Sequence, residues 1–314
     1  MEIKDFGKVG VLMGGPSSER GISLKSGKAV LSALLDLGVD AVGIDITTDN
    51  VDENIKLLKN YNLNLVFIVL HGRFGEDGTI QRILEGMNLP YTASGVSASC
   101  LAMDKIGSLK IFKDGGLNVP KSNFLEKNVY QKNRVYENNL GLPLVIKPAN
   151  HGSSIGLSLV EVNAQIACAI ELAFQFDERI IIEEYIFGRE LTVGVLGEEA
   201  LPVIEIISKN KFFDFAAKYH EGLTEYIIPA HLDEEVAKKV QKAALTAHKL
   251  LGCQGCSRTD IILNKEELPY ILEVNTIPGM TATSLLPKAA KITGIDFNQL
   301  CIKLLELAYE KQKN

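Results

Sequence analysis

The chain has 314 residues, of which 46% are hydrophobic and 23% are charged. This length predicts two or three domains with substantial cores, and the composition excludes extended disorder. The formal net charge of −6 argues against a nucleic-acid partner, because neutralising a phosphate backbone needs clustered lysine and arginine.

The N-terminal segment MEIKDFGKVG has acidic residues before any apolar stretch, so it does not have the pattern of a secretory signal. No apolar run approaches the roughly 18 residues that a membrane span needs. The five cysteines are scattered and odd in number, which is not the pattern of a disulfide framework. We therefore expect a cytoplasmic protein with no membrane contact.

The first hundred residues alternate short apolar runs, at 9–13, 41–46 and 65–70, with amphipathic stretches such as 19–37. Continuous Val, Ile and Leu runs separated by helices are typical of strands buried on both faces of a parallel sheet. This pattern predicts a doubly wound α/β domain. Ligands of such sheets lie beyond the carboxyl ends of the strands, which directs attention to the loops at 14–20 and 71–78.

The rest of the chain divides into two further regions. The second starts near Met103 and contains a helix, a polar stretch at about 126–139, and strands at 144–147 and 179–183. The apolar-to-acidic change after the last of these strands predicts a hinge, so we expect domains at 1–102, 103–183 and 184–314. For the third region we predict strands near 190–196 and 202–207, a polar loop at 209–225, a helix at about 233–251, and a hairpin of 258–263 with 269–274.

The sequence does not match two common nucleotide-binding motifs. The sequence Gly14-Gly15-Pro16 has no glycines at the later positions of a dinucleotide-binding fingerprint. The segment from Gly21 to Gly27-Lys28 is one residue too long for a phosphate-binding P-loop. The oxidoreductase and P-loop interpretations are therefore rejected.

The predicted hairpin carries the strongest chemical signal. Side chains two apart on a strand share a face, so Arg258 lies beside Asp260, and Glu273 beside Asn275. Three hard oxygen ligands on one surface suit Mg²⁺, which binds through carboxylates together with substrate phosphates. Phosphate donors are available from Lys147, which ends a buried strand and would need an anionic partner there, and from the Gly/Ser-rich loop at 150–156.

Seven segments in this order and spacing resemble the D-alanine–D-alanine ligases of the ATP-grasp superfamily, and the resemblance covers nearly the whole chain. The segments are Gly14–Glu19, His71–Gly78, Met103–Lys105, Lys147–Gly156, Lys218–Tyr219, Arg258–Asp260 and Glu273–Thr281. The resemblance implies a Rossmann-like N-terminal domain followed by two ATP-grasp subdomains with mainly antiparallel sheets. It also implies an enzyme that uses ATP to join two D-alanines through an acylphosphate for peptidoglycan synthesis, releasing ADP and phosphate.

The resemblance further implies roles for individual residues around ATP. Lys105 and Lys147 would hold the phosphates, with Ser153 and Ser154 in a flexible phosphate loop, and two Mg²⁺ (or Mn²⁺) ions would be bound by Asp260, Glu273 and Asn275. The adenine and ribose would be framed by Glu183, Tyr185, Ile186 and Glu190. Relatives often carry Trp where this chain has Tyr185, so the packing of the adenine is expected to differ.

Substrate roles are implied in the same way. Glu19 would take the ammonium of the first D-alanine, with His71 nearby, and Ser284 and Lys218 would place the second substrate. Arg258 and the backbone N–H of Gly279 would stabilise the tetrahedral oxyanion, and Glu19, Ser153 and Tyr219 would close a lid. Glu76 and Asp77 belong to one of the resembling segments, but they also stand where a helix is predicted to begin, and the alternative interpretation is that they serve only its N-terminal dipole.

Two alternatives stay open. One is a related ligase that takes D-lactate or D-serine second, which the Lys218-Tyr219 pair disfavours by resemblance. The other is a nucleotide-binding regulator without activity, which the presence of Lys105, Lys147 and the hairpin residues disfavours. Relatives are often dimers, so a homodimer is carried as an expectation, although the sequence marks no interface.

Overall fold

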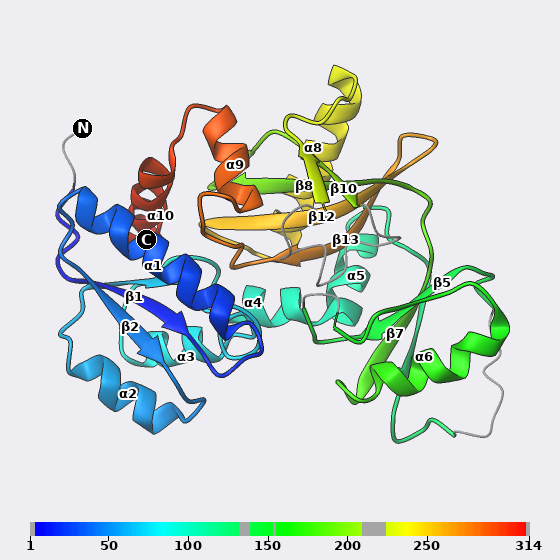
Figure 1. Ribbon diagram of the computed structural model, residues 1–314, viewed down its shortest axis with the longest axis horizontal. Coiled ribbons are helices and arrows are strands. Elements are labelled where there is room, and N and C mark those ends of the chain that lie inside the picture. The colour runs from blue at the N-terminus through cyan, green and yellow to red at the C-terminus, as the bar shows by residue number, and fades with distance from the viewer. Residues whose placement is uncertain (1–3, 132–138, 153–154, 209–223, 312–314) are drawn as a thin grey trace.

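The computed structural model describes residues 4–131, 139–152, 155–208 and 224–311. Three sheets make up its framework, one parallel and two antiparallel (Figure 1). The predicted mixed α/β class is therefore confirmed.

The parallel sheet lies in the N-terminal part of the chain and has the order β2-β1-β3. Its strands are β1 (Val9–Gly14), β2 (Ala41–Ile46) and β3 (Leu65–Ile68), accompanied by the helices α1 (Arg20–Asp36), α2 (Val51–Lys59), α3 (Thr79–Gly86) and α4 (Val96–Met103). All residues of β1 and β3 are buried, as their continuous apolar sequence predicts. The predicted strand at 65–70 is two residues too long, since β3 ends at Ile68, although the backbone N–H of Val69 still donates to the carbonyl of Leu12 in β1.

The second sheet is antiparallel with the order β4-β7-β5-β6. It is formed by β4 (Ser122–Glu126), β5 (Leu144–Pro148), β6 (Ser158–Val160) and β7 (Arg179–Glu184), with the 3₁₀ turn η1 (Asn163–Gln165) and helix α6 (Ile166–Ala173). Helix α6 covers one face of this sheet (Figure 1). The sequence did not predict β4, since it is an edge strand whose residues alternate between exposed and half-buried without a buried run.

The third sheet has the order β11-β10-β8-β12-β13, with β9 paired to β8. Its strands are β8 (Gly188–Leu196), β9 (Glu199–Ala200), β10 (Ile204–Ser208), β11 (Thr224–Ile227), β12 (Cys256–Asn264) and β13 (Pro269–Asn275), and helix α8 (Glu234–Leu250) packs on it. Strand β11 begins within the stretch that was predicted to be a loop at 209–225. Helix α5 (Lys105–Asp114) packs in the same core through Leu109 and Phe112.

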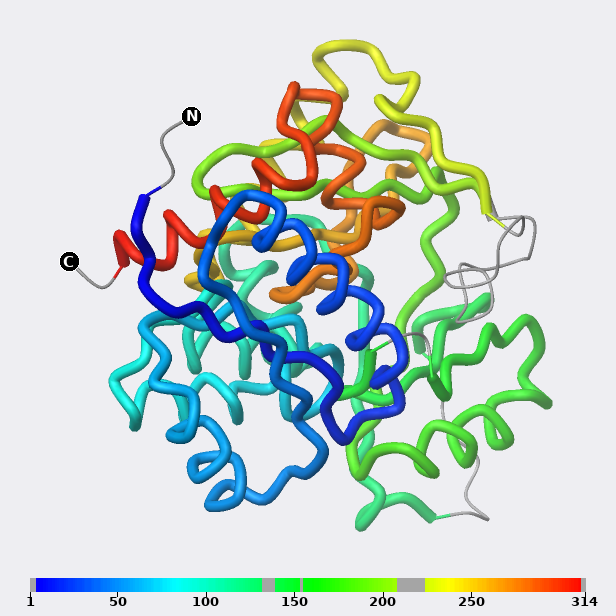
Figure 2. Tube along the Cα trace, turned by 60° about the vertical axis from the view of Figure 1, so that its left-hand side comes forward, coloured from blue at the N-terminus to red at the C-terminus, as the bar shows by residue number. Residues whose placement is uncertain are grey.

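The C-terminal helices return to the N-terminal sheet. Helices α9 (Leu285–Ile292) and α10 (Phe297–Lys311) share one apolar cluster with β1, β3 and α1. Figure 2 shows α10 beside α1, at opposite ends of the colour scale. The first and third sheets are therefore joined by a continuous core, and the domain boundaries at 102 and 183 stay predictions.

A buried histidine makes the stability of this fold depend on pH. His248, in the last turn of α8, is 3% exposed, and its Nδ1 lies 2.7 Å from the Ser257 hydroxyl. Burial, with a smaller contribution from Lys249, lowers the pKa of His248 to about 4. The unfolded chain has the ordinary pKa of about 6.5, so between these values it binds more protons than the folded chain.

Stability should therefore be fully present above pH 6.5 and fall as the pH drops toward 4. At pH 5 the loss due to His248 is expected to be about 2 kcal/mol. Urea unfolding at pH 7 and pH 5 measures this loss. Between these pH values the free energy of unfolding of His248→Gln should fall by about 2 kcal/mol less than that of the unchanged protein. An equal pH dependence in both proteins would contradict the assignment.

Candidate active site

The hairpin of β12 and β13 places the four predicted residues on neighbouring strands. In its register Arg258 lies opposite Asn275, and Asp260 lies opposite Glu273. The register of the pair shifts directly after Asp260, since Ile261 lies opposite Ile271. The hairpin prediction and the shared face of these side chains are thus confirmed by the structure.

Asp260 is fixed by four donors. The guanidinium of Arg258 donates from Nε to Oδ1 (2.9 Å) and from Nη2 to Oδ2 (2.8 Å), and Asn275 Nδ2 lies 3.3 Å from Oδ2. The fourth donor is the fully buried hydroxyl of Thr192 on β8, 2.7 Å from Oδ1. Sequence reasoning missed Thr192, which could have been found only from the register, since it lies opposite Asp260 across the β8–β12 pair.

Two buried lysines approach carboxylates at this site. Lys105 Nζ lies 3.1 Å from Glu273 Oε2 and donates to the carbonyl of His151 at 2.8 Å. Lys147 Nζ lies 2.8 Å from Glu183 Oε2, which supplies the anionic partner that a buried lysine requires. The site therefore concentrates both signs of charge where they are shielded from water.

The donor set fits a divalent cation. Among the described residues no three His, Cys, Asp or Glu side chains are arranged to hold a metal by themselves. Asp260 and Glu273 would contribute two carboxylates, and Asn275 would add an amide oxygen, which would leave coordination positions for phosphate and water. This is the arrangement that Mg²⁺ prefers, because it keeps part of its shell for substrate phosphates and water.

The loops after β1 and β3 meet the segment after β13 at His71. Its Nδ1 lies 3.1 Å from the carbonyl of Ile277, 206 residues away in the chain, so this nitrogen carries the proton and donates. The hydroxyl of Ser17 donates to the carbonyl of His71 (2.6 Å) and accepts from the backbone N–H of Glu19 (3.2 Å). The two predicted ligand loops are thus joined to each other and to the segment after β13.

Glycine is required where these loops touch. Gly72 has φ of +74°, and a Cβ there would lie 2.8 Å from Oε2 of the buried Glu19. At Gly279 a Cβ would lie 2.9 Å from the Ser284 hydroxyl, which also accepts from the backbone N–H of Thr281 (3.1 Å). Gly279 and Ser284 are therefore neighbours.

The electrostatics link these parts into one site. Burial lowers the pKa of His71, against the opposing effect of Glu19, so the ring is neutral at pH 7. Burial raises the pKa of Glu76 to about 8, and the charges of Glu19 and Glu273 contribute. Arg258 acts on both groups. The loop residues His71 and Glu76 are therefore influenced electrostatically by charged residues of the third sheet, Arg258 on both groups and Glu273 on Glu76.

The side chain of Glu76 contacts the loop at 71–78 in addition to standing near the start of α3. Its Oε2 accepts from the backbone N–H of Gly72 at 2.6 Å, so it faces the loop and not only the start of α3. Asp77 does organise the turn into that helix, since it accepts from the backbone N–H groups of Phe74 and Thr79. The position of Glu76 beside Glu19 could not be recognised from chain position alone.

The residues assigned to adenine and ribose lie where β7 leads into β8. Glu183 is 2% exposed, and its Oε1 has no hydrogen-bond partner among the described residues. Tyr185 donates its backbone N–H to the Pro143 carbonyl and packs edge-on to Phe187 at 4.8 Å. Ile186 is half-buried in this connection, and Glu190 lies in β8 opposite Ile206 and Ile262. Ser153, Ser154, Lys218 and Tyr219 lie outside the described residues.

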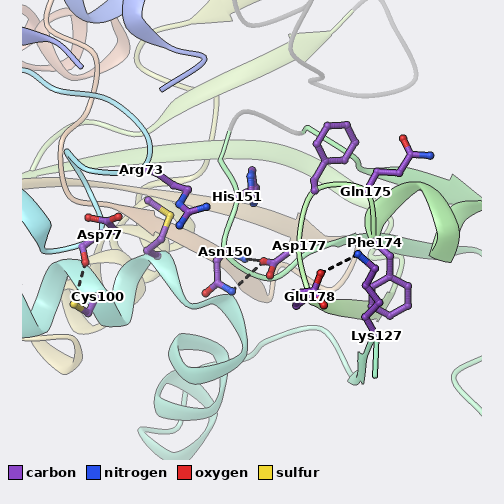
Figure 3. Close-up of a pocket in the computed structure, with 12 residues that line it drawn as sticks. Arg73, Asp77, Cys100, Lys127, Asn150, His151, Phe174, Gln175, Asp177 and Glu178 are labelled. Atoms are coloured by element: carbon purple, nitrogen blue, oxygen red, sulfur yellow. Dashed lines mark hydrogen bonds and ion pairs between the residues drawn. The ribbon is translucent and has the colours of Figure 1, made fainter. Parts of the chain in front are cut away.

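Two adjoining cavities open beside the site. One, of about 630 Å³, is lined by Glu19, Gly72 and Gly152, among others, and so lies between the N-terminal loops and the Gly/Ser-rich loop. The other, of about 490 Å³, lies between Arg73 and Asp77 on one side and the turn at 174–178 on the other (Figure 3). In the part of the chain that the structure describes, no helix is long and apolar enough to cross a membrane.

Comparison with known proteins identifies the family. The profile described as "D-ala D-ala ligase C-terminus" matches residues 111–306, and "D-ala D-ala ligase N-terminus" matches 47–94. A D-alanine–D-alanine ligase of Pelotomaculum thermopropionicum is 47% identical over 96% of this chain and 97% of its own. One of Nitrosospira multiformis is 46% identical over 97% of this chain and 98% of its own.

Comparison with solved structures points to the same family. The D-alanine–D-alanine ligase of Bacillus anthracis complexed with ATP aligns with a TM-score of 0.84 and 32% identity over 98% of both chains. The VanG D-Ala:D-Ser ligase of Enterococcus faecalis aligns with a TM-score of 0.82 and 34% identity over 96% of this chain and 99% of its own. Since one profile spans more than half of the chain and relatives match it nearly end to end, this chain belongs to the D-alanine–D-alanine ligase family.

Proposed function

We propose that this chain uses ATP to condense two D-alanines to D-alanyl-D-alanine for peptidoglycan synthesis, with release of ADP and phosphate. The observation that carries this proposal is the polar face of the β12–β13 hairpin. Asp260 and Glu273 lie opposite each other there, with Arg258 and Lys105 paired to them. Such a face can hold a metal–phosphate group beside fixed cations, which the reaction of an anionic carboxylate with ATP requires.

The reaction has two covalent steps. A carboxylate oxygen of the first D-alanine forms a bond to the γ-phosphorus, and the bond from that phosphorus to ADP breaks. The amine of the second D-alanine then attacks the carbonyl carbon, loses a proton, and the phosphate leaves with the bonding electrons. Because two anions meet in the first step, charge neutralisation and positioning should provide most of the rate enhancement.

Two Mg²⁺ or Mn²⁺ ions are part of this proposal, held by Asp260, Glu273 and Asn275. When bound, they would neutralise charge on the phosphates. Lys105 and Lys147 would bind the same phosphates. The support for this role is their burial beside the carboxylates Glu273 and Glu183, which keeps each ammonium at a defined place.

The nucleotide base is assigned to the connection from β7 to β8. The free Oε1 of Glu183 would accept from the adenine amino group, which would satisfy a buried oxygen that otherwise has no described partner. Tyr185 and Ile186 would frame the adenine, and Glu190 would bind the ribose.

For the amino acids, we infer that Glu19 binds the first ammonium, supported by its place in the lining of the larger cavity. His71 positions this loop as a neutral donor. Arg258 and the Gly279 N–H would stabilise the oxyanion, with Ser284 beside them. The roles of Ser153, Ser154, Lys218 and Tyr219, including the choice of D-alanine as second substrate, remain part of the proposal.

We further infer a cytoplasmic enzyme whose partners are small molecules, with no nucleic acid or membrane involved. A homodimer is proposed by analogy with relatives. Light scattering coupled to size-exclusion chromatography tests it, and a mass equal to one chain across the micromolar range would contradict it.

The function is tested by ADP release with Mg-ATP and D-alanine, compared with L-alanine, D-serine and D-alanine plus D-lactate. The product is identified by mass spectrometry. D-alanyl-D-alanine from D-alanine alone is the expected result. A mixed dipeptide with D-serine or a depsipeptide as the main product would overturn the second substrate, and no ADP from any pair would favour a regulator without activity.

A further inference from the structure

A hydrogen-bonded network joins the loop after β5 to the turn before β7. The carboxylate of Asp177 accepts from the backbone N–H of Asn150 at 2.7 Å and from its side-chain Nδ2 at 3.0 Å, both on Oδ2. Its other oxygen accepts from the backbone N–H of Arg179 at 3.2 Å. Figure 3 shows Asn150 and Asp177 directed toward each other. One carboxylate thus holds both sides of this junction.

The network continues to the start of α5. The guanidinium of Arg179 donates to Oδ1 of Asn150 at 3.3 Å, and its Nη2 lies 3.4 Å from Oδ2 of Asp104. The side-chain amide of Asn150 is therefore oriented at both ends, by an acceptor on one side and a donor on the other. Asp104 is the residue directly before Lys105, at the N-cap of α5.

Lys105 contacts the residues on each side of Asn150. Its backbone N–H donates to the carbonyl of Ala149 at 3.1 Å, and its Nζ donates to the carbonyl of His151 at 2.8 Å. The side chain of Lys105 is 7% exposed and pairs with Glu273. The place of the ammonium is consequently set by a carbonyl whose chain neighbour, Asn150, is bound to Asp177.

We propose that Asp177 is a positioning residue, which holds Asn150 and thereby the carbonyl that orients Lys105 for binding nucleotide phosphates. This inference rests on the proposed function. Without the carboxylate, the backbone and side-chain donors of Asn150 lose their acceptor and the segment is released. Lysine attracts phosphate as a point charge on a flexible stem, so its contribution depends on being held at the correct distance.

Titration calorimetry with Mg²⁺ and the non-hydrolysable analogue adenylyl imidodiphosphate tests this without turnover. Asp177→Asn leaves one acceptor oxygen for the three N–H groups that the carboxylate accepts from, and sets an NH2 group against one of them. This change should raise the Kd by on the order of 10-fold. The neighbouring Glu178→Gln is the matched control, because it removes one charge from an exposed residue that pairs only with the side chain of Lys127 in the described contacts. Its Kd should change less than about twofold.

A double-mutant cycle separates positioning from a general loss of structure. In the Lys105→Ala background, Asp177→Asn should change the Kd by less than about twofold, because the residue that it acts through is gone. The inference would be overturned if Asp177→Asn raised the Kd by the same factor with Lys105 present and with Lys105→Ala. It would also be overturned if Asp177→Asn alone left the Kd unchanged. If Asp177→Asn does not fold, Asn150→Ala in the same cycle replaces it, since it removes the side-chain bonds and keeps the backbone one.

The controls also distinguish this inference from the function on which it rests. Binding of the analogue by the unchanged protein with no effect of Asp177→Asn overturns only the positioning role. No binding by the unchanged, folded protein overturns the proposed function and the inference together.

Discussion

Replacement of Glu273 by alanine is expected to lower the ligation rate by about 10³-fold or more. Glu273 faces Asp260 across the hairpin and pairs with Lys105 at 3.1 Å. Its removal would take away a proposed metal ligand and leave the buried ammonium of Lys105 without its carboxylate, which is costly in a site shielded from water. Steady-state ADP release with saturating D-alanine measures the loss.

A metal-binding measurement and a control variant test whether the loss of activity in Glu273→Ala comes from the metal site. A titration with Mn²⁺ followed by electron paramagnetic resonance should show weaker binding in Glu273→Ala in the presence of nucleotide. Glu266→Ala is the matched control, because Glu266 lies exposed in the turn that joins the same two strands. Near-normal turnover of Glu273→Ala would remove this residue from the metal site.

Arg258→Ala is expected to lower kcat by about 10² or more, with smaller changes in KM. The guanidinium is 16% exposed, and its two bonds to Asp260 fix it in one orientation. A fixed cation of this kind acts mainly on charge that develops during the reaction, so its loss should affect the chemical step more than substrate binding. Steady-state kinetics that vary ATP and D-alanine in turn separate the two effects.

The role of Arg258 can be separated from its support of Asp260. Arg258→Lys keeps the positive charge but not the planar fork, so only part of the activity should return. Thr192→Val removes one donor of Asp260 and leaves the guanidinium in place, and its kcat should fall less than that of Arg258→Ala. An unchanged kcat in Arg258→Ala would exclude Arg258 from the mechanism.

The hairpin shows how much a local pattern can predict. The period of two along a strand and the short turn at 264–267 are properties of neighbouring residues, so the shared faces of Arg258, Asp260, Glu273 and Asn275 could be read from the sequence. The edge strand β4 was missed because its residues lack a buried run. The partner of Asp260 on β8, Thr192, depends on a strand that is distant in the chain.

By itself the sequence determined that strands and helices alternate along the N-terminal part of the chain, which side chains share a face of the hairpin, and that a buried Lys147 needs an anion. These follow from periodicity and from the cost of burying a charge. The tertiary structure decided that Glu183 is this anion, since it is a diagonal neighbour of Lys147 across the β5–β7 register.

Only the tertiary structure brought Lys105 to Glu273, His71 to the carbonyl of Ile277, and Asp177 to Asn150. The members of each pair are separated by many residues and lie in different segments of the chain. Their meeting depends on how the strands and helices around these residues are arranged, which is set by burial of the whole apolar core and has no counterpart in local spacing.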